Sequence, residues 1–257
     1  MQLINALTST LASTARGWRG TKAARTSRQP ETMLKLYEYE GCPFCRLVRE
    51  TLTELDLDAV IYPCPRGGSR WRPEAERVGG RMQFPLLVDD NTGDVLYESA
   101  DIIAHLRAHY GTGHRRQASA PGRRAQLGSS AASALRGFAG TRAQGGGDGP
   151  AQPLELYSFE SSPFSRIVRE TLCELELAYV LRNMGKAVNA DMGPPWVREK
   201  FFADTPVEGR NRKQMMEQTG RLQVPYLIDP NTDTRMYESD DIVRYLHTTY
   251  ASQARQN

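Results

Sequence analysis

The sequence predicts an α/β protein built from two copies of one unit. The second half of the chain repeats the first, which indicates a duplicated domain. Each copy also alternates short apolar runs with stretches of helical periodicity. The offset between matching residues grows from 120 to 140, so the second copy carries about twenty extra residues between about 183 and 215. The matching stretches are 34–37 with 154–157, 43–52 with 163–172, and 97–99 with 237–239.

The first half of each copy is predicted to form a strand, a helix and a second strand. Residues 33–39 and 59–62 are short apolar runs of strand length. Residues 43–56 have helical spacing, and Pro43 suits the first helical position because its missing N–H is not needed there. The expected buried face of this helix comprises Phe44, Leu47, Val48, Thr51, Leu52 and Leu55.

The second half of each copy is predicted to add a helical segment, a hairpin and a final helix. Residues 70–79 are polar and helical, and strands at 85–89 and 95–97 flank an Asp-Asn-Thr-Gly turn. Ser99 is expected to cap the last helix. The buried face of that helix comprises Ile102, Ile103, Leu106 and Tyr110. The complete order is β-α-β-α-β-β-α, and the second copy repeats it.

Composition separates basic connectors from the folded units. The net charge is +3, yet residues 1–30 contain five basic side chains and no acid, and residues 111–153 contain six arginines and one acid. These connectors are expected either to attract the acidic domains or to meet an anionic partner, but no aromatic interleaving favours nucleic acid. The predicted parts are a basic helical arm at 1–30, a first domain at 31–111, a linker with a short helix at 112–152, and a second domain at 153–251 with an insertion at 183–215.

The N-terminal segment has two interpretations. An acid-free stretch rich in Arg, Ser and Thr is typical of an organelle transit peptide. However, residues 16–21 recur at 136–141, which favours two equivalent short helices at 5–18 and 125–138. We therefore expect a bacterial cytoplasmic protein, with a plastid location as the alternative. No apolar run approaches the roughly 18 residues of a membrane-spanning helix, so no membrane span is expected.

The clearest chemistry lies in the Cys-Pro-Phe-Cys stretch at 42–45, at the start of the first predicted helix. Backbone N–H groups and the helix dipole at that end stabilise a thiolate, which lowers a cysteine pKa from about 8.5 toward neutrality. Cys42 is then the nucleophile, and Cys45, one turn inward, is the resolving thiol. A zinc half-site and an inert buried pair are the alternatives. Cys64 and Cys173 supply no second CxxC, and the histidines show no ligand spacing, so no metal is expected.

The second copy departs from this pattern because Ser162 and Ser165 replace both cysteines, so no disulfide can form there. One interpretation is a degenerate domain kept for packing or binding. The other follows from a resemblance to glutathione transferases, some of which use a serine hydroxyl near this place to stabilise a bound thiolate, and it implies that role for Ser162. Cys173 aligns with Thr53 and is expected in the core, and Cys64 is expected to be structural. The inserted residues can lie over the second cleft or between the domains.

Together these features resemble the glutaredoxin-like thioredoxin fold, and most closely the N-terminal domain of glutathione transferases. The resemblance covers nearly all of both copies and extends to tandem proteins of bacteria and plastids. It implies two thioredoxin-like domains, each a mixed four-stranded sheet with helices on both faces. It also implies that Pro85 and Pro225 are cis, which presents the backbone of Phe84 and Val224 to the cysteinyl part of glutathione.

The resemblance further implies a carboxylate site at the last helix of each copy. Glu98 with Ser99, and Glu238 with Ser239, match the acidic-serine pair of that family. The serine hydroxyl and the helix N–H groups would hold the γ-glutamyl carboxylate. The implied glutathione-binding residues are Phe84, Pro85, Glu98, Ser99, Ser162, Val224, Pro225, Glu238 and Ser239.

The leading hypothesis is a glutathione-linked thiol–disulfide oxidoreductase in which Cys42 attacks a disulfide or a glutathionylated protein thiol. Glutathione is the co-substrate. The second domain is degenerate and contributes binding or substrate selection. The alternatives are a non-catalytic tandem module that holds glutathione or a protein partner, an iron–sulfur carrier ligated through Cys42, and a glutathione transferase. The last is disfavoured because the helical C-terminal domain of true transferases has no counterpart in the sequence.

Overall fold

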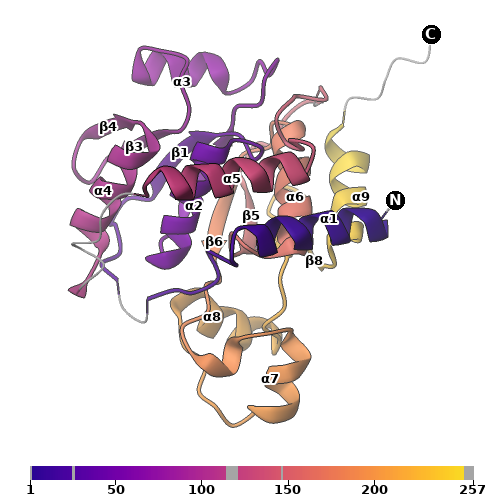
Figure 1. The fold of residues 1–257 in the computed structure, drawn as a ribbon. Helices are drawn as coiled ribbons and strands as arrows, with labels where there is room; N and C mark the ends of the chain where they lie inside the picture. The colour runs from indigo at the N-terminus through magenta and orange to yellow at the C-terminus, as the bar shows by residue number, and fades with distance from the viewer. Residues whose placement is uncertain (1, 25–26, 114–120, 146, 252–257) are drawn as a thin grey trace.

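A computed structural model of the chain describes residues 2–24, 27–113, 121–145 and 147–251 (Figure 1). The first copy consists of β1 (Leu34–Glu38), α2 (Pro43–Glu54), β2 (Ala59–Pro63), α3 (Arg72–Gly79), β3 (Leu86–Asp89), β4 (Asp94–Tyr97) and α4 (Ser99–Tyr110), preceded by α1 (Gln2–Ala15). The second consists of β5 (Leu154–Ser158), α6 (Pro163–Glu174), β6 (Tyr179–Asn183), α8 (Arg210–Thr219), β7 (Tyr226–Asp229), β8 (Thr234–Tyr237) and α9 (Ser239–Tyr250), preceded by α5 (Arg123–Leu135). The inserted residues form a 3₁₀ helix (Asn189–Asp191) and α7 (Pro195–Phe201). None of the described helices is long and apolar enough to cross a membrane.

The eight strands form one continuous sheet in the order β4-β3-β1-β2-β6-β5-β7-β8. Each half is the predicted mixed four-stranded sheet, in which the first strand is parallel to the second and antiparallel to the third. The halves meet where β2 and β6 pair in antiparallel fashion, with Val60 opposite Val180. This pairing satisfies backbone groups that would otherwise form two open sheet edges. The two domains are therefore one body, which the sequence did not predict.

One apolar core extends through both copies. Leu36 and Leu156 of the sheet belong to the same buried cluster as Leu52 and Leu172 of the helices. α2 packs against α4, and α6 packs against α9. Phe44 does not lie on the buried face as predicted, because it is 45% exposed. It stands in the first turn of α2, which belongs to the candidate site rather than to the core.

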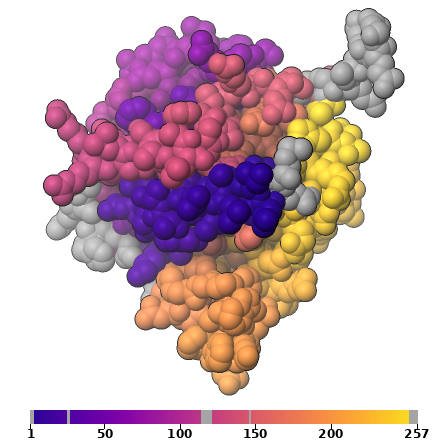
Figure 2. Space-filling view, turned by 45° about the vertical axis from the view of Figure 1, so that its right-hand side comes forward, coloured from indigo at the N-terminus to yellow at the C-terminus, as the bar shows by residue number. Residues whose placement is uncertain are grey.

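The two helices that precede the copies exchange places. α1 packs against α6 of the second copy, and α5 packs against α2 of the first. The two helices also lie side by side across one face, as Figure 2 shows. Ser9 Oγ donates to the carbonyl of Pro163 at 2.7 Å, and Ser129 Oγ donates to the carbonyl of Pro43 at 2.7 Å. The equivalent helices predicted from the repeat are therefore present, and each one contributes to the other copy.

The basic connectors contact acidic residues of the domains, as one of the two interpretations expected. Arg16, after α1, pairs with Glu50 at 2.7 Å. Arg136, after α5, pairs with Glu170 at 2.5 Å. All four side chains are at most 10% exposed, so these pairs are part of the folded interior.

Two local predictions are wrong. Ser99 is the first residue of α4 and not its N-cap, which is Glu98. Glu98 has a φ of 60°, and Glu238 before α9 has a φ of 66°. This left-handed turn brings the following serine into helical geometry one residue early, so its hydroxyl is not in the capping position.

The second wrong prediction concerns residues 141–153, whose composition, rich in Gly, Ala, Arg and Pro, predicts a flexible linker. Ala143 N donates to Arg66 O at 3.0 Å in the first copy. Gln144 N donates to Glu174 O at 2.8 Å in the second copy. This part of the linker is therefore hydrogen-bonded to both copies.

Candidate functional site

Cys42 is the N-cap residue of α2, with an extended backbone at φ −71° and ψ 121°. Its Sγ accepts the backbone N–H of Cys45 at 3.2 Å. Pro43 takes the first helical position, where no N–H is required. The sulfur of Cys42 therefore lies at the N-terminus of a helix, as the sequence predicts.

The two thiols of this pair ionise differently. Burial raises the pKa of Cys42, but hydrogen bonds from the Cys45 thiol and from the N–H groups of Cys45 and Phe44, together with the charge of Arg49, outweigh burial and lower it from 9.0 to about 7. Burial and the hydrogen bond to Cys42 raise the pKa of Cys45 well above its usual value. Near neutral pH, Cys42 is thus about half thiolate, while Cys45 keeps its proton.

Cys42 is covered by α5 and is only 2% exposed. Ser129 of α5 bonds the carbonyl of Pro43, and Ser133 of α5 accepts Arg46 Nη2 at 3.1 Å. We therefore expect movement of α5, which packs against α2, to open the way to Cys42. The sequence contained no sign of this cover.

Gly41, directly before Cys42, lets the chain after α5 pack closely. Its N–H donates to Gly140 O at 3.4 Å. A Cβ at position 41 would lie 2.9 Å from Ala139 O, which is closer than side-chain carbons normally approach. A glycine is therefore required here by the contact between the two copies.

A buried charged cluster joins the two copies beside Cys42. Arg49 bonds Glu160 at 2.8 Å and Glu40 at 3.1 Å. Arg169 bonds Glu40 at 3.0 Å and Glu160 at 3.1 Å. Arg46 and Arg49 belong to this buried cluster, since their side chains are only 2% and 1% exposed. Their partners come partly from the other copy, which no local pattern reveals.

The cluster differs between the copies at one position. Arg49 bonds Glu38 in the first copy, whereas Arg169 donates to Ser158 Oγ at 2.9 Å in the second. Burial raises the pKa of Glu38 to about 8, and Arg49 opposes this rise. With every group ionised the cluster carries a charge of +1, and this excess favours a Cys42 thiolate. Its members are Arg46, Arg49, Arg166, Arg169, Glu38, Glu40 and Glu160.

Both prolines before the third strand of their copies follow a cis peptide bond, as the resemblance implies. Pro85 is buried, and Phe84 before it is half-buried beneath Arg72, whose guanidinium carbon lies 5.1 Å from the ring. Tyr39 lies edge-on to Phe84 at 6.4 Å between ring centroids. Burial and the interaction of its hydroxyl with Cys42 raise the pKa of Tyr39. Tyr39 is therefore a site residue that sequence reasoning missed, although its position at the end of the first strand was a usable signal.

The predicted carboxylate sites have the same arrangement in both copies. Glu98 and Glu238 are exposed, and Gln83 and Gln223 donate to them through their side-chain amides. Each following serine is buried at the first helical position. In this arrangement the glutamates already have a hydrogen-bond donor. Whether they take part in binding glutathione stays a prediction.

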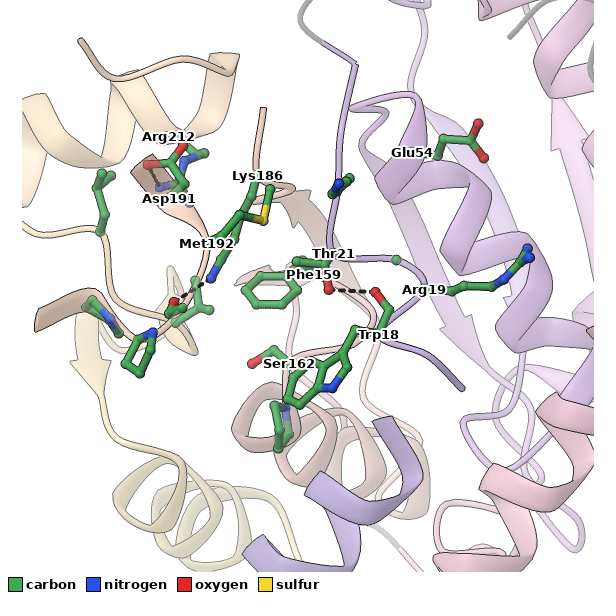
Figure 3. A pocket seen from close by; sticks show the side chains of 18 of the residues that line it. Trp18, Arg19, Thr21, Glu54, Phe159, Ser162, Lys186, Asp191, Met192 and Arg212 are labelled. Carbon is green, nitrogen blue, oxygen red and sulfur yellow. Dashed lines mark hydrogen bonds and ion pairs between the residues drawn. The ribbon is translucent and has the colours of Figure 1, made fainter. Parts of the chain in front are cut away.

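The second copy has a cavity of about 1120 Å³ at the place that corresponds to Cys42 (Figure 3). Residues 162–164 at the start of α6 line it, together with Val224 before the cis proline. Ser162 Oγ accepts the N–H of Ser165 at 3.3 Å and so repeats the geometry of Cys42. The cavity lining includes none of the residues 42–45. The other predicted residues of this copy lie outside the lining, namely Pro225, Glu238 and Ser239.

The insertion forms one wall of this cavity and therefore lies over the second cleft, one of the two placements that the sequence left open. Residues 191–195 and parts of α7 and α8 line that wall. The opposite wall comes from residues 17–22, which follow α1. In Figure 3, Lys186 and Trp18 approach the ring of Phe159 from two sides.

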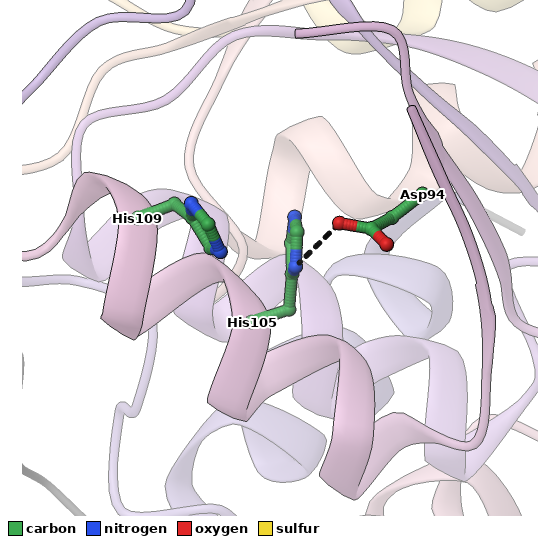
Figure 4. A group of neighbouring side chains, drawn as sticks. All are labelled: Asp94, His105 and His109. Atoms are coloured by element: carbon green, nitrogen blue, oxygen red, sulfur yellow. Dashed lines mark ion pairs between the residues drawn. The ribbon is translucent and has the colours of Figure 1, made fainter. Parts of the chain in front are cut away.

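Asp94, His105 and His109 lie together on α4 and the neighbouring hairpin (Figure 4). One ligand atom of each lies within 4.8 Å of the others, a set that can hold a divalent metal. The i, i+4 spacing of the histidines was the signal that the sequence analysis passed over. However, His105 Nε2 is hydrogen-bonded to Asp89 at 2.8 Å. In the second copy Tyr245 occupies the position of His105, and its hydroxyl donates to Asp229, the equivalent of Asp89, at 2.6 Å. This structural contact accounts for His105 without a metal.

The other two cysteines are buried, as expected. Cys173 Sγ donates to Gly140 O at 3.1 Å, and burial raises its pKa well above the usual value. Burial also raises the pKa of Cys64, which packs in an apolar cluster. Neither thiol has the environment of a nucleophile.

The fold and the two cis prolines agree with comparison to known families. A family model described as "Glutathione S-transferase, N-terminal domain" matches residues 36–116 and 156–254, which together make up more than half of the chain. No curated protein and no solved structure matches the sequence. The chain belongs to the glutathione S-transferase N-terminal domain family and contains two such thioredoxin-like domains in tandem.

Proposed function

We propose that this protein is a glutathione-linked thiol–disulfide oxidoreductase whose chemistry takes place at Cys42. The observation that carries the proposal is the Cys42 sulfur at the N-cap of α2, hydrogen-bonded by Cys45 and with its pKa lowered to about 7. Such a sulfur is a competent nucleophile near neutral pH. Membership of the family supports glutathione as the co-substrate.

In the proposed reaction, the Cys42 thiolate attacks the glutathione sulfur of a glutathionylated thiol. An S–S bond forms between Cys42 and glutathione, the original S–S bond breaks, and the released thiolate takes a proton from solvent. A second glutathione thiolate then attacks the same sulfur, which yields oxidised glutathione and regenerates the Cys42 thiolate. Alternatively, Cys45 loses its proton and attacks the Cys42 sulfur of the mixed disulfide. The bond between Cys42 and glutathione then breaks, a Cys42–Cys45 disulfide forms, and the released glutathione thiolate takes a proton from solvent. The raised pKa of Cys45 favours the route through glutathione.

Movement of α5 is part of this proposal, because Cys42 is only 2% exposed beneath it. The second domain contributes binding rather than sulfur chemistry, since serines replace both of its cysteines. Its cavity supports that role, because it is large and lies at the corresponding helix start. A non-catalytic binding module is therefore the second candidate function.

The test is reduction of 2-hydroxyethyl disulfide by glutathione, measured through the oxidised glutathione formed. We expect turnover by the wild-type chain and none by Cys42→Ser, together with a glutathione adduct on Cys42 in mass spectrometry. Cys64→Met and Cys173→Thr are matched controls, because Met184 and Thr53 occupy the equivalent positions of the other copy. Full activity of Cys42→Ser would exclude the redox proposal, and lack of turnover by the wild-type chain would leave the binding module.

A further inference from the structure

We propose that the cavity of the second domain binds an organic anion with an aromatic or aliphatic body. The anion would lie between residues 17–22, the start of α6 and the insertion. This inference rests on the binding role proposed above for the second domain and names its ligand class. It does not depend on Cys42, which is not part of the cavity lining.

The size and construction of the cavity point to a small-molecule ligand. Its volume of about 1120 Å³ lies slightly above the roughly 300–1,000 Å³ that is usual for such sites. Segments of both domains, far apart in the sequence, build it: the chain after α1, one face of α2, the first turn of α6, and the insertion with α8. The first domain has no equivalent of the insertion, so this wall is particular to the second.

The cavity wall carries an excess of positive charge. Asp191 Oδ1 accepts both Arg198 at 2.6 Å and Arg212 at 2.8 Å, so one carboxylate serves two guanidinium groups. Glu50, another acid of the lining, is already paired with Arg16. The charged lining residues are the basic Arg19, Lys22, Arg107, Lys186, Arg198 and Arg212 and the acidic Glu50, Glu54, Asp191 and Glu199.

The buried polar atoms of this wall are incompletely satisfied. Arg212 is 4% exposed, yet its Nε has no hydrogen-bond partner among the described residues. Leaving such a donor unpaired inside a protein is costly. Asp191 Oδ2 in the same wall likewise has no partner among the described residues, so the wall contains both an unpaired donor and an unpaired acceptor.

Lys186 is the cation best placed to meet an anion inside the cavity. Its Nζ lies 5.3 Å from the ring centroid of Phe159 and donates to Gly193 O at 2.7 Å. No ion pair joins it to a carboxylate of the described residues. Burial, and then the charge of Arg212, lower the pKa of Lys186 to about 8. A bound anion would relieve this repulsion between the two cations.

The lining also contains large apolar side chains that are exposed. Trp18, Phe164 and Met216 are 43%, 51% and 41% exposed, although large apolar side chains are normally covered. All three line the cavity, so a ligand body would cover them together. Cations and exposed apolar side chains in one lining fit an amphipathic anion better than a cation or a sugar-like polar molecule.

The test compares two fluorescent probes on the full chain: 8-anilinonaphthalene-1-sulfonate and its uncharged relative N-phenyl-1-naphthylamine. We expect the sulfonate to bind at least about tenfold more tightly, because it alone can pair with Lys186. Lys186→Met should weaken binding of the sulfonate about tenfold and leave binding of the neutral probe unchanged. Lys186→Arg keeps the positive charge and should restore the preference for the sulfonate. Lys186→Gln serves as the second variant if Lys186→Met does not fold in thermal denaturation.

The duplicated chain supplies matched controls. Trp18→Ala should weaken both probes, whereas Phe138→Ala, at the equivalent exposed position outside the cavity, should weaken neither. Arg66→Met is the equivalent control for Lys186→Met. Cys42→Ser should keep full probe binding, so a failed redox proposal would leave this result standing. Equal affinity for the two probes, or equal effects of the cavity variants and their controls, would overturn the inference.

Discussion

Arg49 Nε of the first domain donates to Glu160 Oε2 of the second at 2.8 Å, and neither side chain is more than 2% exposed. The repeat relates Arg49 to Arg169 and Glu40 to Glu160, so each domain supplies a carboxylate to the other's arginine. A domain alone would bury its arginine without this partner, which carries a large desolvation cost. The two copies therefore depend on each other through a polar cluster as well as through the β2–β6 pairing.

Glu160→Gln should destabilise the whole chain by about 3–5 kcal/mol, because it removes one of the few carboxylates that compensate the buried arginines. Urea unfolding of the wild-type and variant chains measures this difference. The control is Asp90→Asn in the Lys35–Asp90 pair, whose side chains are 37% and 42% exposed. That variant should lose less than about 1 kcal/mol. Equal losses in the two variants would contradict the structural role of the cluster.

Alkylation of Cys42 by iodoacetamide should reach half of its maximal rate near pH 7, because the folded pKa is lowered to about 7 from 9.0. The same lowering affects stability. Between these two pH values the folded state has released the proton and the unfolded state has kept it, so stability rises with pH. The contribution is complete above the unfolded pKa and is lost as the pH falls through about 7. Urea unfolding at pH 7 and pH 9 should show this rise in the wild-type chain and not in Cys42→Ser.

Cys45→Ala should raise the pKa of Cys42, because it removes the thiol that donates to the Cys42 sulfur. A rise of about one unit would lower the thiolate fraction at pH 7 from about one half to about one tenth, and alkylation would slow about fivefold. The alkylation rate at pH 10 should stay unchanged, since Cys42 is ionised in both proteins at that pH. Cys173→Thr is the control, and an unchanged profile in Cys45→Ala would show that this hydrogen bond does not set the reactivity.

The double variant Ser129→Ala, Ser133→Ala should speed the alkylation of Cys42. It removes two hydrogen bonds that hold α5 over α2. Each bond contributes about 0.5–1.5 kcal/mol, so opening of the cover should become about fivefold more frequent or more. The equivalent change in α1, Ser9→Ala with Ser13→Ala, should leave the rate at Cys42 unaffected. If both double variants react like the wild-type chain, α5 does not control access.

Ser162→Cys should place a reactive thiol in the second domain. Ser162 Oγ already accepts the N–H of Ser165 in the way that Cys42 Sγ accepts that of Cys45. Ser162 is 3% exposed, much like Cys42, but it lines the cavity and Cys42 does not. The new thiol should therefore be alkylated faster than Cys42 at the same pH. Mass spectrometry of the peptides after timed alkylation compares the two sites. A slower reaction at position 162 would mean that the cavity does not give access to the start of α6.

Several site features were readable from sequence because they depend on short stretches. Cys42 before a proline at a helix start needs only its neighbours to define its geometry, and the same holds for the prolines at 85 and 225. Predictions failed where a neighbouring turn or a distant partner decided the outcome. Ser99 is not the N-cap, because Glu98, whose φ is positive, occupies that position. Arg49 is buried with Glu160 as one of its partners, and Glu160 comes from the other copy.

The sequence alone determined the duplicated β-α-β-α-β-β-α unit, its helix-start cysteines and the loss of both in the second copy. These features follow from periodicity and from the internal repeat, which are properties of contiguous residues. Only the tertiary structure decided that α1 and α5 exchange copies, that β2 joins β6, that Cys42 is covered and that the cavity lies in the second domain. Each of these depends on contacts between segments far apart in the chain, which form because sheet edges, buried charges and apolar faces must find partners that local sequence does not specify.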